Sequence, residues 1–354
     1  MSAVRAAALS LALALVLAVG LALPRGASRA ETSAAKMRGM VVSCPIYGQV
    51  WGSEDFSEAL RTLKGLGVRW VQIHPYARIE RSGRVRFTPP EATGYLAGAV
   101  ARARREGVPL FWKPHLAYWG SFAWRGAIDF GDDEAAWDRF FETYRAFILA
   151  QARFAAESGI PLFSVGTELD ATTRFSGRWR RLIREVRAVY PGELTYAANW
   201  DRVMSTPFWD ALDYVGAQGY HPLELGGSPS ASAAWAAWAG ARSAMEDLHR
   251  RTGKRILFTE IGYPDAAHAA RTPWKPRGLL DRAAPSLRRS LVRVALERVE
   301  ALPYVAGMFW WKWIPGRTRG DFAMQPEDMR ALLSDAWGPS TASKRDVDAA
   351  GAGP

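Results

Sequence analysis

Two glutamates stand where short apolar runs of the sequence end, and a carboxylate is costly to bury there without a partner or a purpose. Glu168 closes the run 163–168, and Glu260 closes the run 256–260. Both runs are rich in β-branched and aromatic residues and too short for helices, so each predicts a buried strand. Two carboxylates that face each other across a cleft are the equipment for breaking a glycosidic bond.

The spacing of the two glutamates indicates how they come together. They lie 92 residues apart in the sequence. A strand–helix unit of a (β/α)8 barrel takes about 30 residues, so the interval holds about three units. It places Glu168 at the end of the fourth strand and Glu260 at the end of the seventh, on the same rim of one barrel.

The elements that must position this pair alternate between strand and helix. The strand candidates are residues 39–44, 68–74, 109–114, 162–167, 194–199, 214–219, 255–259 and 306–310. Amphipathic stretches between them include residues 56–66, 137–157, 175–190 and 286–301. Glycines such as Gly107 and Gly253 are expected to end helices before the next strand begins. The pattern predicts an α/β protein with a single (β/α)8 TIM barrel over residues 37–338.

A doubly wound open sheet is the alternative fold. It would normally carry a glycine-rich phosphate loop after its first strand. The segment Cys-Pro-Ile-Tyr-Gly at residues 44–48 is not such a loop, so the barrel is favoured. The segment 224–234, which is rich in Gly, Ser and Pro, predicts a long surface loop after the sixth strand.

Polar and aromatic residues gather at seven successive strand ends, a pattern that core packing explains poorly. In barrel enzymes the catalytic residues lie at these ends, so the pattern predicts an active site there. The substrate-binding candidates are His74, Lys113, His115, Asn199, Trp200, Tyr220, His221 and Trp310. A phenol such as Tyr220 can orient a carboxylate nucleophile by a hydrogen bond. Because Trp310, Trp311 and Trp313 alternate along one strand, at least one should face the barrel mouth and one should face outward.

Two other chemistries are open to these residues. Three histidines make a zinc set, but His74, His115 and His221 come from separate strands with no close-spaced pair, so hydrogen bonding to substrate is favoured and no metal is expected. Lys113 could form an imine with a carbonyl substrate, as in barrel aldolases. The two glutamates argue against the imine, which remains the natural alternative.

With these residues in place, the chain resembles glycoside hydrolase family 113, within the clan A barrel enzymes, from about residue 38 to residue 337. The most specific segments are residues 165–169, 194–200 and 258–263, and residues 112–115 and 309–311 agree as well. The resemblance implies a retaining enzyme that acts on β-linked glycans, chiefly an endo-β-1,4-mannanase, with hydrolysis of xylan, glucan or an envelope polysaccharide as the alternative. It implies no cofactor.

By this resemblance, Glu168 is the general acid/base and Glu260 is the nucleophile. Glu168 must then be protonated while Glu260 is ionised, so their surroundings should push the two pKa values apart. Retention needs carboxyl groups about 5–5.5 Å apart, against about 6.5–9.5 Å for inversion. Most clan members have Asn before the acid/base, whereas this chain has Thr167, and Asn199 is our candidate for binding the sugar 2-hydroxyl.

The N-terminal segment of the chain predicts export. Residues 6–23 are almost wholly Ala, Leu and Val after Arg5, and Ser28-Arg29-Ala30 offers a cleavage site, so residues 1–30 are typical of a signal peptide. A retained membrane anchor is the alternative. Export would put the chain in the periplasm or outside the cell. The polar tail 339–354 predicts disorder.

The composition and net charge limit the classes of molecule that the protein is expected to bind. Apolar residues make up 49% of the chain, enough for a large core, and there are 16 tryptophans, a residue that stacks well on sugar rings. The net charge of +11 is spread along helical stretches without a basic tail or nucleic-acid motif, so we expect a polysaccharide or oligosaccharide substrate, no nucleic acid, and a monomer. Two non-enzymatic alternatives are a carbohydrate-binding barrel without turnover and a basic envelope protein.

Overall fold

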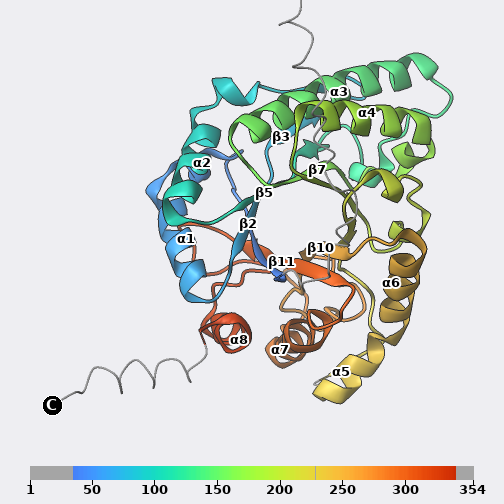
Figure 1. Cartoon of the computed structure of the whole chain (residues 1–354). Helices are drawn as coiled ribbons and strands as arrows, with labels where there is room; N and C mark the ends of the chain where they lie inside the picture. The colour runs from blue at the N-terminus through green and yellow to red at the C-terminus, as the bar shows by residue number, and fades with distance from the viewer. Residues whose placement is uncertain (1–34, 228, 340–354) are drawn as a thin grey trace, which may run out of the picture. The chain divides into compact units, whose positions relative to one another are not determined.

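Eight parallel strands close into a barrel in the computed structural model, which describes residues 35–227 and 229–339. Around the barrel the order is β1, β11, β10, β9, β8, β7, β5, β2. The strands are β1 (Met37–Val42), β2 (Trp70–Ile73), β5 (Leu110–Trp112), β7 (Leu162–Thr167), β8 (Glu193–Ala198), β9 (Val215–Gln218), β10 (Ile256–Ile261) and β11 (Val305–Trp313). Each overlaps one of the eight predicted strands, so the (β/α)8 prediction is confirmed (Figure 1).

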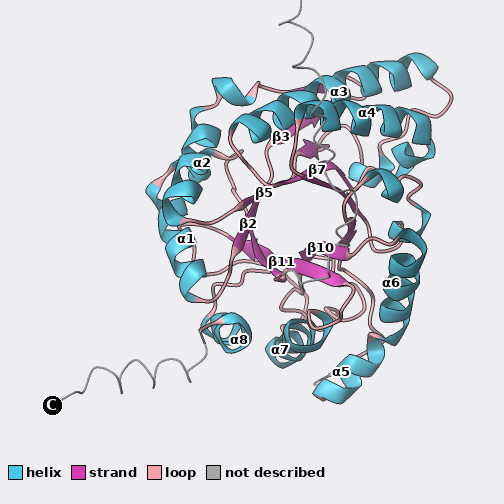
Figure 2. Cartoon of the chain, in the orientation of Figure 1, coloured by secondary structure: helices cyan, strands magenta, loops and turns pink. Residues whose placement is uncertain are grey.

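Helices form a ring outside the strands (Figure 2). They are α1 (Glu54–Gly65), α2 (Gly94–Glu106), α3 (Glu134–Glu157), α4 (Ser176–Val189), α5 (Ala231–Ala237), α6 (Ala239–Thr252), α7 (Pro285–Val294) and α8 (Glu327–Trp337). A π-helical turn, Ala295–Val299, follows α7. Gly107 and Gly253 end α2 and α6 with φ of 65° and 66°, a left-handed backbone that suits glycine and confirms the predicted helix ends.

Two apolar cores follow from the alternation of side chains along the strands. The inner core fills the barrel, where the rings of Phe111 and Phe309 lie 5.0 Å apart beside Leu162 and Leu257. The larger outer core lies between the strands and the helices and includes Trp112, which donates a hydrogen bond to Gln151 of α3. The phase of this alternation decides which strand residues can reach the barrel mouth.

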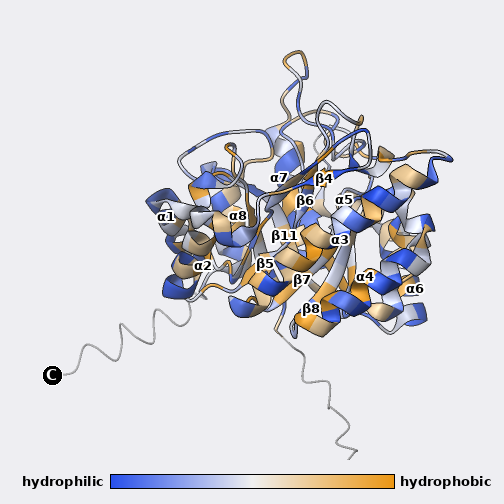
Figure 3. Ribbon diagram, turned by 90° about the horizontal axis from the view of Figure 1, so that it is seen from above, coloured by the Kyte–Doolittle hydropathy of each residue, from blue (hydrophilic) through white to orange (hydrophobic). Residues whose placement is uncertain are grey.

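A second, smaller sheet was not foreseen. Its order is β4 (Val85–Arg86), β3 (Tyr76–Ile79) and β6 (His115–Ala117), so it continues the chain just beyond β2 and β5. Figure 3 shows long connections gathered on one side of the barrel, where β4 and β6 also lie. The smaller sheet therefore extends the rim of the barrel that carries the strand ends.

One local prediction needs correction. The loop expected at 224–234 ends early, because α5 begins at Ala231. Ser230 caps this helix by accepting a hydrogen bond from the backbone N–H of Ala233, and the alanines that follow favour helix. The predicted signal peptide, and the predicted tail from residue 340 onward, lie outside the described residues. In the part of the chain that the structure describes, no helix has the length and apolar character needed to span a membrane.

Candidate active site

Both glutamates lie at the carboxyl ends of barrel strands. Glu260 is in β10, and its side chain is 6% exposed; Glu168 directly follows β7, and its side chain is 16% exposed. The backbone of Glu168 has φ of 54°, in the left-handed region that non-glycine residues rarely adopt, and its N–H donates to the carbonyl oxygen of Ala197. Such strained conformations cluster at functional sites.

The carboxylate of Glu260 is held by two buried side chains. The Nζ of Lys113 donates to Oε1 at 2.5 Å, and the phenol of Tyr220 donates to Oε2 at 3.0 Å. Burial lowers the pKa of Lys113, while the charge of Glu260 works to raise it. The ion pair engages the Lys113 amine, so the geometry favours a positioned carboxylate over imine chemistry. A carboxylate oriented in this way, with a cation beside it, suits a nucleophile.

The carboxylate of Glu168 has different partners. Its Oε2 accepts hydrogen bonds from Arg125, at 3.0 Å from Nε and 2.7 Å from Nη2, and its Oε1 accepts one from Gln218 Nε2 at 3.0 Å. Burial works to raise the pKa of Glu168, but the charges of Arg125 and Lys113 and the hydrogen bonds lower it below its ordinary value. This direction differs from the raised pKa that we expected for a general acid.

Arg125 is the functional candidate that sequence reasoning missed. It lies on a 3-10 turn, Arg125–Ala127, in the connection between β6 and α3. Its guanidinium also lies over the ring of Tyr118, at 5.6 Å from the centroid. Because Arg125 precedes Glu168 by 43 residues and belongs to no motif, no local pattern points to this pair.

Two buried histidines contact each other, and one of them, His115, lies beside Glu260. The rings of His74 and His115 are 4.9 Å apart, and His115 Nε2 is 4.0 Å from Glu260 Oε1. Burial lowers the pKa of both histidines well below the usual range, so we treat them as neutral. Among the described residues, His74 Nδ1 and both ring nitrogens of His115 have no hydrogen-bond partner. Neutral imidazoles can donate and accept, which suits sugar hydroxyl groups.

The described residues contain no group of three or more His, Cys, Asp or Glu side chains placed to hold a metal ion. The His74 and His115 rings contact each other, but His221 lies apart from them. It is buried between Trp200, at 6.1 Å between ring centroids, and Trp238, at 5.6 Å. Burial lowers the pKa of His221 to about 4. His221 therefore backs Trp200, and its contact with substrate stays a prediction.

Asn199 is oriented by a neighbouring carboxylate. Its Nδ2 donates to Asp170 Oδ2 at 2.9 Å, while Oδ1 of Asp170 is buried without a partner in the described residues. Burial, with the charges of Glu168 and Asp201, raises the pKa of Asp170 to about 6, although the Asn199 hydrogen bond works to lower it. Asp170 thus positions the predicted ligand of the 2-hydroxyl.

Two tryptophans form a stack on the rim. Trp200, which follows β8, stacks on Trp274 with 5.7 Å between ring centroids and 20° between ring planes. Trp274 is exposed and comes from the connection after β10. Sequence reasoning found Trp200 but not Trp274, since the two are distant in the chain. The pair offers an aromatic surface for a sugar ring.

The prediction for Trp310 is wrong. Trp310 is fully buried in the outer core, between strands and helices, so it cannot contact a substrate in the mouth. Its neighbours in the strand face the other way: Phe309 is in the inner core and Trp311 packs against it. The ring of Trp311 lies 5.7 Å from that of His74. The alternation thus selects Trp311 for the mouth.

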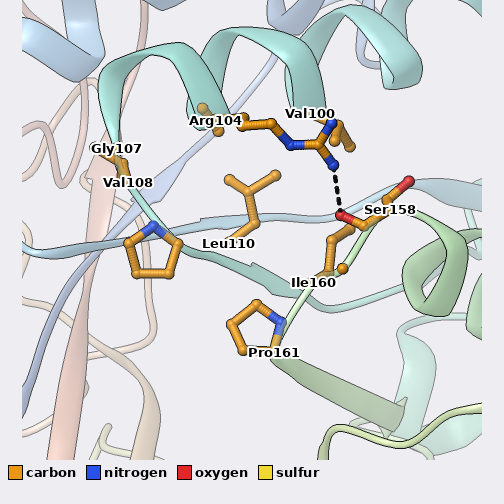
Figure 4. Close-up of a pocket in the computed structure, with 11 residues that line it drawn as sticks. Val100, Arg104, Gly107, Val108, Leu110, Ser158, Ile160 and Pro161 are labelled. Carbon is orange, nitrogen blue, oxygen red and sulfur yellow. Dashed lines mark hydrogen bonds between the residues drawn. The ribbon is translucent and has the colours of Figure 1, made fainter.

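A hollow elsewhere lacks comparable chemistry. It lies where the connections from α2 to β5 and from α3 to β7 meet, and it has a volume of about 330 Å³ (Figure 4). Its lining is mainly apolar, with Val108, Leu110 and Ile160, and Arg104 donates to the carbonyl oxygen of Ser158. No carboxylate or histidine is among its lining residues. The rim around Glu168 and Glu260 remains the candidate active site.

Comparisons with known proteins agree with this fold. The model of Glycoside Hydrolase Family 113 matches residues 46–329. A solved β-mannanase of that family from Alicyclobacillus acidocaldarius has a TM-score of 0.74 and 21% identity, covering 86% of this chain and 98% of its own. Another solved family 113 β-1,4-mannanase has a TM-score of 0.75 and 22% identity, covering 86% and 99%. A family 5 mannosidase from Rhizomucor miehei has a TM-score of 0.56 and 11% identity, covering 85% and 92%. No curated protein matches the chain.

Proposed function

This chain belongs to glycoside hydrolase family 113 and is a glycoside hydrolase, and on that premise we propose that it cleaves β-1,4-mannan with retention of configuration. The observation that carries the proposal is the unequal setting of the two glutamates. Glu260 is paired with Lys113 and Tyr220, whereas Glu168 lies nearer to solvent on the same rim. Two solved family 113 relatives, a β-mannanase and a β-1,4-mannanase, support the choice of substrate.

In the first step, Glu260 attacks the anomeric carbon and the bond to the leaving oxygen breaks. Glu168 gives that oxygen its proton, so the products are a glycosyl ester on Glu260 and a free sugar hydroxyl. In the second step, Glu168 takes a proton from water, and the water oxygen attacks the same carbon and releases Glu260. Two inversions at one carbon give net retention.

Arg125 must respond to this cycle. As the general acid, Glu168 needs a proton, but its contact with Arg125 favours the ionised form. As the general base in the second step, Glu168 must be ionised, and the same contact then stabilises it. We therefore expect Arg125 to move away from Glu168 when glycan enters and to return after the leaving group departs.

The remaining residues suit a neutral sugar. His115, with His74 packed against it, brings a neutral ring nitrogen beside Glu260, and Asn199, held by Asp170, can reach a hydroxyl from the neighbouring strand end. Trp200 with Trp274 offers a stacking surface at the rim. The side chains near the glutamates therefore suit the binding of sugar hydroxyl groups, and the tryptophans on the rim suit stacking against a sugar ring.

We also propose that the enzyme acts outside the cytoplasm, because residues 1–30 have the charge and apolar pattern of an export signal. A polysaccharide too large to enter a cell must be cut where it is found. Fractionation of cells that express the whole chain tests this, with the periplasm or medium as the expected location.

Reducing-sugar release by the protein lacking residues 1–30 tests the function on mannan, glucomannan, xylan and β-glucan. Mannan should be cleaved by the unmodified chain and by Glu246→Gln, a matched change at an exposed glutamate of α6, but not by Glu260→Gln. Proton NMR of the first product should show the β-anomer. Release from another polymer alone would reject mannan, and silence of the folded protein on all four would reject the proposal.

A further inference from the structure

The sheet formed by β3, β4 and β6 has one buried face and one open face. Ile79 and Val85 are buried in the outer core together with residues of α3, so this face is turned inward. Side chains alternate along a strand, so Tyr76 and Arg78 belong to the other face. Arg78 is exposed there, and Tyr76 is half-buried.

Two arginines stand opposite each other on the open face. Arg78 pairs with Arg86 in the antiparallel register of β3 and β4. Like charges directly opposite are destabilising in a sheet. Arg86 has a carboxylate partner in Glu80, whereas Arg78 has no ion pair among the described residues. The arrangement leaves a cation free to receive an anionic group.

The same face lines a hollow of about 420 Å³, a size within the range of ligand sites. Its lining includes Tyr47, Tyr76, Arg78, Arg86 and Trp119. Tyr47 is 70% exposed and Trp119 is 53% exposed, which is unusual for such large apolar side chains. Aromatic rings that can stack on a sugar therefore lie beside guanidinium groups that can bind a carboxylate.

The hollow continues from the active site. The ring of Tyr76 lies 5.4 Å from that of His74 and 5.7 Å from that of His115, the histidine beside Glu260. On its other side, Tyr76 lies 5.9 Å from Trp119. A glycan chain held at the two glutamates can therefore extend over Tyr76 into the hollow.

We propose that this hollow is a subsite for a uronic acid unit of the glycan, with its carboxylate bound by Arg78 and Arg86 and its ring packed against Trp119 or Tyr47. The inference rests on the proposed function and refines its substrate class: the preferred chain is β-linked and carries carboxylates. A neutral mannan then fills the subsite without using its charge.

Two tetrasaccharides that differ only at C6 test the subsite. β-1,4-Mannotetraose is neutral, and the β-1,4-linked mannuronate tetramer carries a carboxylate on each ring. Calorimetric titration into Glu260→Gln, which does not turn over, should show at least about tenfold tighter binding of the mannuronate, because a charge-assisted pair with arginine is strong. High salt should reduce this preference.

The control is an arginine on the nearby turn. Arg81 is exposed and does not line the hollow, so Arg81→Met in the same background should keep the preference. Arg78→Met should reduce it to within about twofold. Trp119→Ala should weaken both tetrasaccharides, because stacking does not depend on charge.

Equal affinity for the two tetrasaccharides would overturn the subsite, and so would an equal loss in Arg81→Met and Arg78→Met, which would mean a nonspecific attraction to a basic surface. Failure of the proposed function looks different. If the unmodified enzyme cleaves mannan but shows no preference, the function stands and the subsite falls. If mannuronate binds tightly through Arg78 but no glycan is cleaved, the subsite stands and the function falls.

Discussion

The surroundings of Glu260 and of Glu168 differ in almost every respect. Glu260 lies within β10, and its ammonium partner Lys113, which directly follows β5, is fully buried. Glu168 lies just beyond its strand on a left-handed backbone, and its guanidinium partner Arg125 comes from a connecting segment. A nucleophile needs one charge state, whereas an acid/base must change its own. The difference teaches that a barrel strand end supplies the partner of Glu260, whereas a connecting segment supplies the partner of Glu168, the one that the proposed mechanism requires to move.

The largest expected effect is a difference between the Glu168 and Glu260 variants in how strongly their hydrolysis rates depend on the leaving group of the substrate. Glu168→Ala should slow the hydrolysis of mannan by about a hundredfold or more, the usual contribution of a general acid. A dinitrophenyl mannoside needs no proton to depart, so its first step should stay fast in this variant, and azide should restore turnover and give the β-mannosyl azide. Glu260→Gln should be slow on both substrates. If both variants hydrolysed the dinitrophenyl mannoside equally slowly, the assignment of different roles to Glu168 and Glu260 would be contradicted.

The second effect concerns stability. Lys113→Met leaves Glu260 buried without its cation, so the free energy of unfolding should fall by about 3–5 kcal/mol. The double variant Lys113→Met with Glu260→Gln should recover most of that loss, because no unpaired charge remains. Denaturant unfolding monitored by circular dichroism measures both. Additive losses in the double variant would show that the pair is not coupled.

The third effect is a pH shift. Because Arg125 lowers the pKa of Glu168, Arg125→Met should raise that pKa and move the alkaline limb of the kcat/KM profile to higher pH. Below the new pKa, more of Glu168 is protonated and able to act as acid. Arg145→Met, at an exposed ion pair with Glu185, is the matched control. An unmoved limb in Arg125→Met would contradict the role given to this contact.

The smallest effect concerns Asp170, whose pKa in the folded protein, about 6, is raised above its ordinary value of 3.8. The folded state therefore binds more protons than the unfolded state between about pH 4 and pH 6, and stability falls as pH rises through this window. Asp170→Asn should raise Tm at pH 8 relative to the unmodified chain and give little gain at pH 4. The exposed Asp335→Asn should show no such pH dependence. A gain of equal size at both pH values would contradict the raised pKa.

Much of the barrel could be predicted because its signals are local. Short apolar runs that end in a carboxylate identify β7 and β10, and glycines such as Gly107 mark the helix ends. The partners of Glu168 could not be predicted in this way. Arg125 and Gln218 lie 43 and 50 residues from it, and their contacts depend on where folding places a turn and a neighbouring strand.

The tryptophans of β11 show a different limit. The sequence indicates that neighbouring side chains face opposite ways, but not which of them faces the mouth. The register between β1 and β11 shifts near the end of the strand, so local spacing cannot settle the phase. The small sheet was missed because β4 has only two residues, too few for a periodic signal.

The proposed mechanism requires Glu260 to be the nucleophile. Incubation with 2-deoxy-2-fluoro-β-mannosyl fluoride, followed by proteolysis and tandem mass spectrometry, identifies the residue that carries the trapped sugar. We predict one fluoromannosyl ester, on Glu260, that is absent in Glu260→Gln. A label on Lys113 or Glu168, or steady turnover of mannan by a protein that never takes up the label, would contradict the account.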